Sequence, residues 1–215
     1  MTNKNRDQCL RCGTCCLKGG PVLHYEDKWL LRKGHIGYQN LITIRKGERA
    51  YDSINDTLKP VDRELVKVRG TGKEWSCCFY DRKNSACTIY EHRFLECRLL
   101  KCWDPSALAD VAGKNTITRE DIINAHDPIR EVIAMHEQAC PYEEVEKLVA
   151  GLSRERERAE SMVRLNTLVR RDLAIRTYAI SELGLREEFE LFIFGRPLFK
   201  VLGFLEGYFP PVTRR

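Results

Sequence analysis

The feature that most constrains this chain is a run of four cysteines near its N-terminus, Cys9-x-x-Cys12-x-x-Cys15-Cys16. Two residues between successive cysteines allow a tight turn to direct neighbouring sulfurs toward one point, as a thiophilic metal requires. Three cysteines at this spacing also match the run that holds three corners of a [4Fe–4S] cluster in bacterial ferredoxins. The segment therefore predicts a metal-binding loop.

The other cysteines extend this prediction. The chain has ten cysteines, and it begins with polar residues that do not resemble an export signal, so we expect a reducing, cytoplasmic compartment. Stable disulfides are rare in such a compartment, and clustered cysteines there indicate metal binding. The candidate metal ligands are Cys9, Cys12, Cys15, Cys16, Cys78, Cys87, Cys97, Cys102 and Cys140.

Two pairs of adjacent cysteines limit the ligand set. Successive side chains of a strand point to opposite faces, so we expect Cys78 rather than Cys77 to reach the site. Cys15 and Cys16 diverge in the same way, which leaves one of them for a second centre or as a reactive thiol. Two clusters would divide the ligands into Cys9, Cys12, Cys15 and Cys140 for one, and Cys16, Cys78, Cys87 and Cys97 for the other. One cluster with spare thiols is an equal alternative.

Local patterns predict the elements around this loop. Apolar and polar residues alternate over 41–46 and 64–69, which is typical of short strands, and 75–80 is a third candidate strand. Thr118 and Asp121 have the spacing of a capping box and predict a helix start near Arg119. Further helices are predicted over 25–33 and 89–101, from Pro128, and as one long helix from Pro141 along an apolar stripe to Leu173.

These elements indicate an α+β fold. An irregular, cysteine-rich metal-binding module with a small β-sheet, residues 1–117, would be closed by a mainly α-helical region, residues 118–215, that packs on it. Cys140 would tie the helical region to the metal site, and Cys140-Pro141 resembles the cysteine–proline pair of ferredoxin motifs. The aromatic-rich segment 185–210 is expected to pack in the core or to contact a partner or a membrane surface.

Composition excludes several classes of function. The net charge of +5 results from 36 basic and 31 acidic side chains, and no dense Lys/Arg run marks a nucleic-acid surface. No run of 18 apolar residues predicts a transmembrane segment. Hydrolase and kinase functions have no support, because G-x-S-x-G, H-E-x-x-H and phosphate-loop motifs are absent.

The cysteine pattern favours an iron–sulfur protein with one or two [4Fe–4S] clusters. It would transfer electrons to a redox or protein partner, or support redox or group-transfer chemistry at a cluster. Arg93 and Arg98 would contact this cofactor, since positive charge near the sulfurs offsets the negative charge of a thiolate-bound cluster. The alternative is a zinc-binding structural or protein-interaction module, because four cysteines suffice for a structural zinc site.

The cysteines and their neighbours also resemble a known family. The matching residues are Cys9-x-x-Cys12-Gly13-x-Cys15-Cys16, Cys78-Phe79, Cys87-Thr88-Ile89-Tyr90-Glu91-His92-Arg93 and Cys97-Arg98. This set resembles the CxxCxxCC cysteine-cluster family, the YkgJ-like proteins with a zinc- or iron-chelating domain, over about residues 9–102. Phe94 stands where the family usually has a proline.

The resemblance implies metal chelation and leaves the reaction open. A protein-lysine N-methylase with the same cysteine signature is thought to carry an iron–sulfur cluster and to use S-adenosylmethionine, so a lysine methyltransferase is a further alternative by analogy. This chain has neither a glycine-rich nucleotide loop after a strand nor the C-x3-C-x2-C run of radical S-adenosylmethionine enzymes.

Overall fold

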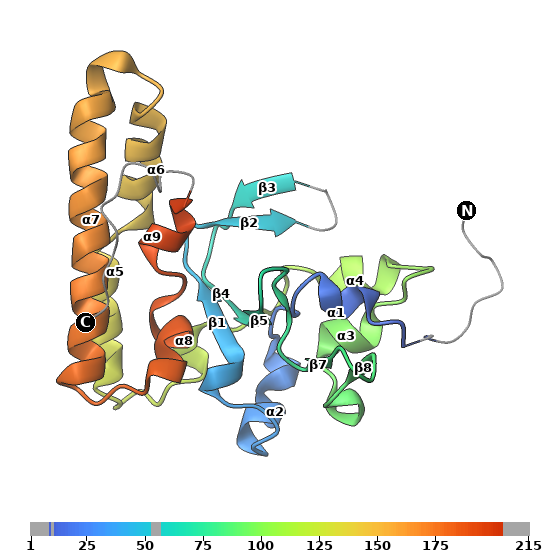
Figure 1. Cartoon of the computed structure of the whole chain (residues 1–215). Helices are drawn as coiled ribbons and strands as arrows, with labels where there is room; N and C mark the ends of the chain where they lie inside the picture. Colours follow the sequence, from blue (N-terminus) through green and yellow to red (C-terminus); the bar gives the residue numbers. More distant parts are fainter. Residues whose placement is uncertain (1–8, 10, 53–56, 204–215) are drawn as a thin grey trace.

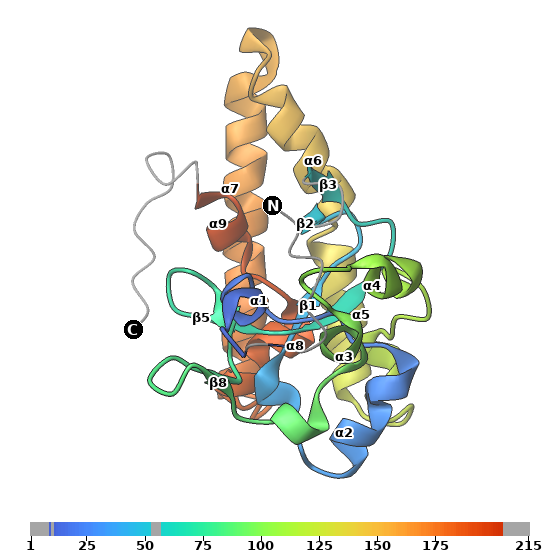
Figure 2. The same ribbon diagram turned by 90° about the vertical axis from the view of Figure 1, so that its right-hand side faces the viewer.

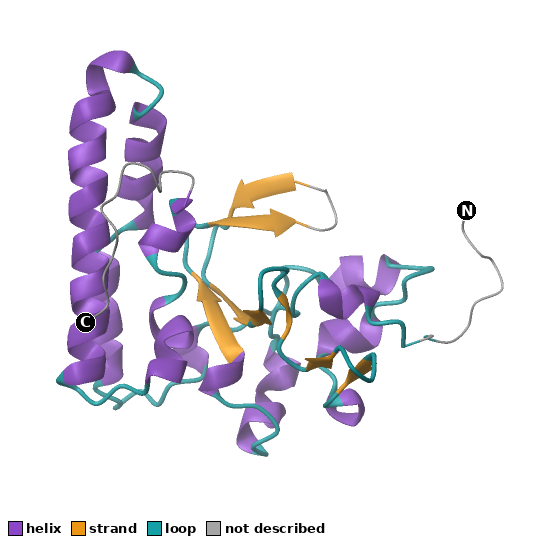
Figure 3. Cartoon of the chain, viewed as in Figure 1, coloured by secondary structure: helices purple, strands orange, loops and turns teal. Residues whose placement is uncertain are grey.

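The computed structural model describes residues 9, 11–52 and 57–203, and it confirms the predicted α+β class. Figure 1 shows the long helices on one side, short strands in the middle and the cysteine-rich loops on the other side. Figure 3 shows the same division by secondary structure. The strands of the described residues pair in two-stranded antiparallel sheets, and no larger sheet organises this part of the chain.

The central sheet pairs the two segments in which alternation predicted strands. β1 (Leu41–Ile44) runs antiparallel to β4 (Leu65–Val68). Every residue of β1 is buried, because α8 (Glu190–Phe194) packs on it, and Thr43 Oγ1 donates a hydrogen bond of 2.6 Å to the Phe192 carbonyl. Both strand predictions are confirmed.

The cysteine-rich region is built from much shorter elements than predicted. The candidate strand at 75–80 divides between two hairpins, and the candidate helix at 89–101 is interrupted by extended backbone at Arg93 and Phe94. The hairpins pair β5 (Gly70–Thr71) with β6 (Ser76–Cys77), and β7 (Tyr80–Asp81) with β8 (Ala86–Cys87). The helical turns are α1 (Thr14–Leu17), η1 (Tyr25–Asp27), α2 (Lys28–Arg32), η2 (Tyr38–Asn40), η3 (Tyr90–His92), α3 (Leu95–Leu99) and α4 (Ser106–Val111).

A further hairpin, which the sequence patterns did not predict, projects from the body in Figure 1. It pairs β2 (Arg49–Asp52) with β3 (Thr57–Pro60). All four residues of β3 are exposed, so this segment has no apolar face with the period of a half-buried strand. That missing pattern explains why the hairpin was not recognised.

The helical half departs from prediction at one place. The single long helix expected from Pro141 was wrong, because α6 (Tyr142–Gly151) ends before α7 (Glu155–Ser181) begins, and Arg154 between them is extended. Figures 1 and 2 show the two helices side by side. The apolar stripe is therefore folded back on itself, and Val145 and Leu148 of α6 share a second core with Leu165 and Leu168 of α7.

The predicted helix starts are confirmed, with one helix shorter than expected. Thr118 and Asp121 form the capping box, but the helix is only the single turn η4 (Arg119–Asp121). α5 (Ile129–Ala139) begins after Pro128, and the Asp127 carboxylate accepts a hydrogen bond of 3.0 Å from the Ile129 amide. The side chain of Asp127 thus stabilises the first turn.

The aromatic-rich segment supplies core residues. Phe192 and Phe194 of α8 are fully buried in the main core, after η5 (Glu187–Phe189) and before α9 (Leu198–Val201). Phe204, Tyr208 and Phe209, for which a partner or membrane contact was considered, lie outside the described residues. In the described ranges, no helix combines the length and the apolar character needed to cross a bilayer.

The two regions predicted from sequence share one core. Leu23 and Phe94 of the cysteine-rich region pack in the same cluster as Ala179 and Phe192 of the helical region. A buried ion network also spans the junction: Glu137 of α5 accepts hydrogen bonds from Arg45, at 2.8 Å, and from Arg119, at 2.7 Å. Buried guanidinium groups need such partners, because an unpaired charge in the interior is costly.

A second buried polar group fixes α7 to α5. His136 Nε2 lies 2.6 Å from Asp172 Oδ1, and both side chains are fully buried. Burial lowers the pKa of His136, which therefore stays neutral in the folded chain. Burial acts to raise the pKa of Asp172, but the hydrogen bond from His136 and the charge of Arg176 lower it overall.

Because His136 is buried in its neutral form, we expect the folded chain to lose stability in acid. In the unfolded chain His136 gains a proton below pH 6.5, whereas the folded chain resists protonation until its lower pKa is reached. The free energy of unfolding should fall by up to about 1.4 kcal/mol per pH unit in that window. Urea denaturation from pH 7.5 to pH 5 should show a shallower decline in His136→Gln than in the wild type. His126→Gln, at an exposed histidine, is the control, and equal slopes in all three chains would contradict the prediction.

Candidate metal centre

Separate segments of the chain bring six cysteines together beside the main core. α1 contacts β6, and the β7–β8 hairpin and α3 lie next to them in Figure 1. In Figure 2 this side of the molecule faces the viewer. Electrostatic interactions and core contacts connect the members of this six-cysteine cluster, which are Cys15, Cys16, Cys77, Cys78, Cys87 and Cys97.

The adjacent thiols of α1 share a proton. The Cys16 thiol hydrogen-bonds Cys15, which lowers the pKa of Cys15 to about 6, and the charge of Arg93 acts in the same direction. The same hydrogen bond, followed by burial and the neighbouring cysteines, raises the pKa of Cys16. Cys15 and Cys16 are consecutive residues of the short helical turn α1, and each thiol changes the pKa of the other.

Cys77 and Cys78 form a second adjacent pair. A hydrogen bond between the two thiols raises the pKa of Cys77, where burial adds to the effect, and lowers the pKa of Cys78. The argument that separated them was wrong, because β6 ends at Cys77 and Cys78 lies beyond the strand. Cys78 Sγ is 3.8 Å from the Asn40 carbonyl, and Arg69 contributes to its lowered pKa.

Cys87 and Cys97 complete the cluster. Burial raises the pKa of both thiols, and Cys77 and Cys15 raise it further by charge repulsion. Thiolates are the form that binds metal, so these raised values mean that the cluster lacks enough positive charge to ionise fully. A cation among these sulfurs would remove that penalty.

Three of the other predicted ligands lie on the surface. Cys9, Cys12 and Cys102 are exposed. Cys12 Sγ is 3.2 Å from Thr14 Oγ1, a hydrogen bond that lowers the pKa of Cys12, and its charge interaction with Cys15 places it at the edge of the cluster.

Cys140 is not brought to the other cysteines. It is fully buried in the second core, between α5 and α6, and its Sγ donates a hydrogen bond of 3.8 Å to the Leu168 carbonyl. Burial raises its pKa to about 11, and its charged neighbours are Asp172, Arg45, Arg171 and Arg176. The helical region is tied to the rest through the shared core and Glu137 rather than through Cys140.

The two arginines predicted to contact a cofactor are placed differently. The guanidinium of Arg93 stacks on the Tyr90 ring at 3.9 Å and lies close enough to lower the pKa of Cys15 and of Cys87. Arg11 stacks on the same ring at 4.1 Å, so Tyr90 connects the N-terminal loop to the 87–97 segment. Arg98 is exposed and acts on Asp27 instead.

A buried carboxylate, Asp27, and a partly buried one, Glu96, hold α3 in place. Asp27 accepts hydrogen bonds from the amides of His24, at 3.0 Å, and Leu95, at 2.8 Å. Glu96 accepts from the Val22 amide at 2.9 Å and lies 3.2 Å from His24 Nε2. These contacts fix the position of Cys97, and no spacing rule in the sequence pointed to them.

Phe94 has the backbone conformation that a proline at this position would have. Its φ of −60° lies in the range that a proline ring imposes. Its side chain is buried and packs against Phe79, with ring centroids 6.0 Å apart. The substitution therefore adds core contact without altering the path of the chain into α3.

The donor set suits a thiophilic metal in kind, because all six members are thiols, although the sulfurs are not arranged as a finished site. Among the described residues, no three His, Cys, Asp or Glu side chains have the geometry of a metal site. Cys77 packs in the main core, and Cys16, Cys78, Cys87 and Cys97 pack against it.

Comparison with known proteins gives one match. Residues 8–141, well over half of the chain, match the model of the family CxxCxxCC, described as a "putative zinc- or iron-chelating domain". The matched range includes the whole six-cysteine cluster. It extends beyond the cysteine motifs of residues 9–102 to just past the end of α5. No curated protein and no solved structure matches the chain.

The geometry of the turn before α1 indicates that Gly13 cannot be replaced without a loss of stability. Its φ is +75°, and a Cβ at this position would overlap the ring of Tyr80. Gly34 has a similar φ of +72° with open space around it, so Gly34→Ala measures the backbone strain alone, about 1–2 kcal/mol. Gly13→Ala should lower the melting temperature more than Gly34→Ala and should increase iodoacetamide labelling of Cys16. Equal melting temperatures in the two variants would contradict the packing role of Gly13.

Proposed function

This chain belongs to the CxxCxxCC family, and we propose that its six-cysteine cluster binds iron as a [4Fe–4S] cluster used for electron transfer or for redox or group-transfer chemistry. The proposal rests mainly on one observation: thiols from α1, β6, β8 and α3 interact with one another at the edge of the core. Iron–sulfur chemistry also fits the reducing cytoplasmic compartment expected from the sequence.

The positive charge of two arginines near the cysteines supports this proposal. A [4Fe–4S] centre with four thiolate ligands carries net negative charge, and hydrogen bonds or cations near the sulfurs stabilise it. Arg93 acts on Cys15 and Cys87, and Arg69 acts on Cys78. The residues that would hold the cluster are Cys15, Cys16, Cys77, Cys78, Cys87 and Cys97, with Cys12 at the edge.

Zinc is the second candidate, and the irregularity of the region favours it. Elements of two to five residues surround the cysteines, and four thiolates on a zinc ion stabilise such segments outright. In that case the chain would be a structural or protein-interaction module.

Metal and sulfide analysis separates these candidates. Full-length protein purified without oxygen should be brown and contain about four iron and four acid-labile sulfide per chain for one cluster, or about eight of each for two. Zinc without sulfide in a colourless protein would contradict the iron–sulfur proposal and support the structural module. An absence of both metals after reconstitution would contradict metal binding by this cluster.

Cysteine variants test which thiols are used. Cys15→Ser and Cys97→Ser should each lose most of the bound metal, because each removes a thiol from the six-cysteine cluster. Cys140→Ser is the matched control: it keeps a donor to the Leu168 carbonyl and should retain the wild-type metal content. Far-ultraviolet circular dichroism would verify that each variant folds. Equal metal loss in all three would show that Cys140 belongs to the ligand set after all.

A further inference from the structure

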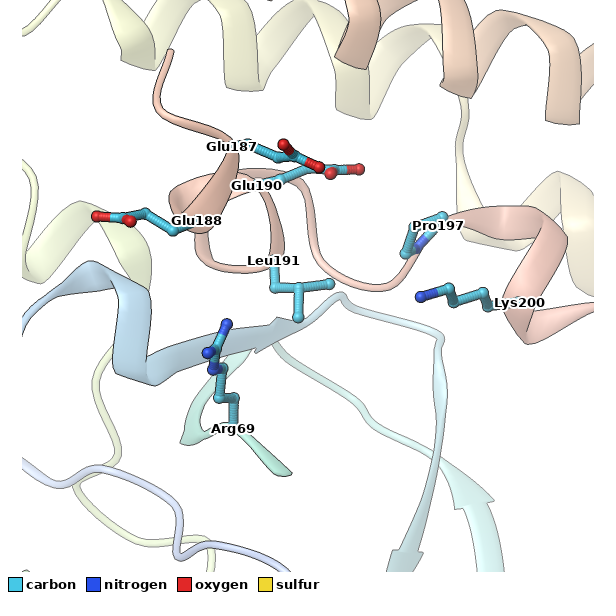
Figure 4. A pocket seen from close by; sticks show the side chains of 7 residues that line it. All are labelled: Arg69, Glu187, Glu188, Glu190, Leu191, Pro197 and Lys200. Atoms are coloured by element: carbon cyan, nitrogen blue, oxygen red, sulfur yellow. The ribbon is translucent and has the colours of Figure 1, made fainter. Parts of the chain in front are cut away.

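A pocket of about 430 Å³ lies beside the six-cysteine cluster, and the function proposed above does not use it. It is formed where the chain leaves β4 and meets η5, α8 and α9. Figure 4 shows Arg69 and Lys200 extending toward Leu191 from different sides of this pocket. Its lining residues are Arg69, Glu187, Glu188, Glu190, Leu191, Pro197 and Lys200.

The two cations of the pocket have no carboxylate partner among the described residues. Arg69 Nε is buried and makes no hydrogen bond there, although a guanidinium nitrogen removed from water normally has an acceptor. Lys200 is exposed, and its Nζ lies 6.0 Å from the Phe199 ring, too far for more than a weak contact. Lys200 Nζ therefore has donors available to a ligand, and the Arg69 guanidinium, which lines the same pocket, has no carboxylate partner in the described part of the chain.

The acidic side chains of the pocket are already engaged. Glu190 Oε1 accepts a hydrogen bond of 3.2 Å from Arg176, and Glu188 forms an ion pair with Arg186. Glu187 also takes part in an interaction. Glu190 and Glu188 are therefore paired with arginines outside the pocket lining, and Arg69 and Lys200 are the lining cations without a carboxylate partner in the described ranges.

We propose that this pocket binds a small organic anion, with its carboxylate or phosphate group held by Arg69 and Lys200. A guanidinium offers parallel N–H donors that match the geometry of a carboxylate or phosphate, and an ammonium adds a second charge. Leu191 and Pro197 provide apolar surface for the remainder of the molecule. The volume of this pocket, about 430 Å³, lies within the range of small-molecule sites.

Arg69 also connects this pocket to the six-cysteine cluster. The Cys78 amide donates a hydrogen bond of 3.1 Å to the Arg69 carbonyl, and the Arg69 amide donates one of 2.9 Å to the Asn40 carbonyl. The same Asn40 carbonyl accepts from Cys78 Sγ. An anion on Arg69 would therefore sit next to the candidate metal centre and would change the charge that Cys78 experiences. Anion binding itself does not require a metal.

Anion titration of the full-length protein tests the proposal. Two-dimensional ¹H–¹⁵N spectra would be recorded with increasing succinate, or with inorganic phosphate, against sodium chloride at matched ionic strength. We expect saturable shifts at the amides of Arg69, Leu191 and Lys200 with at least one of the two anions. Succinate alone would identify a carboxylate site, and phosphate alone a phosphate site.

Charge variants give the discriminating result. Lys200→Gln and Arg69→Gln should each weaken binding by about tenfold, whereas Lys147→Gln, an exposed cation on α6, should leave the affinity unchanged. Lys200 is also exposed, so its replacement leaves the fold intact, and Arg69→Lys restores charge if Arg69→Gln unfolds. The absence of saturable shifts with both anions, or equal affinity in the wild type and Lys200→Gln, would overturn the proposal. Metal content is measured separately, so failure here leaves the proposed metal centre standing.

Discussion

The crowding of six thiols against the edge of an apolar core is the constraint on which the rest of this structure depends. Burial and mutual repulsion raise the pKa of Cys87 and Cys97, because a thiolate at either position would face other thiols in a medium that screens charge poorly. Positive charge near the sulfurs offsets this repulsion and favours the thiolate form. Arg93 and Arg69 supply part of this positive charge. Arg93 lowers the pKa of Cys15 and opposes the rise in that of Cys87, and Arg69 lowers the pKa of Cys78.

Holding these thiols together requires a rigid surround, since their own segments contain little regular structure. The surround is the core that both halves of the chain share, with β1 beneath α8 and the carboxylates of Asp27 and Glu96 fixing α3. Glu137 joins Arg45 and Arg119 across the same junction. The cysteine-rich region is therefore closed by the helical region, as the sequence predicted, and shares its core. It is one side of a single packed body.

Much of the local structure could be predicted from the sequence where one physical rule dominates. Alternation identified β1 and β4, and capping residues identified the starts of η4 and α5. The prediction of one long helix from Pro141 was wrong, because the spacing of apolar residues is the same in one continuous helix and in two helices that pack antiparallel. The β2–β3 hairpin had no apolar face to reveal it. The cysteine spacing identified most of the candidate centre, but Cys140 and Cys77 required tertiary contacts, which no spacing contains.

Cys140 and Cys77 also show why residue type alone does not define a ligand set. Cys140 is followed by proline, as a distant cluster ligand often is, yet it is enclosed among apolar side chains and hydrogen-bonds a carbonyl of α7. Its burial is that of a small hydrophobic residue. Cys77 has no motif in its favour, yet Cys15 raises its pKa, and Cys77 in turn raises the pKa of Cys87 and of Cys97. The two residues differ in that Cys77 packs with other thiols and Cys140 does not. In this fold α1 brings Cys15 and Cys16 to the other thiols, because α1 packs on β6 and the turn at Gly13 before it packs on Tyr80 of β7.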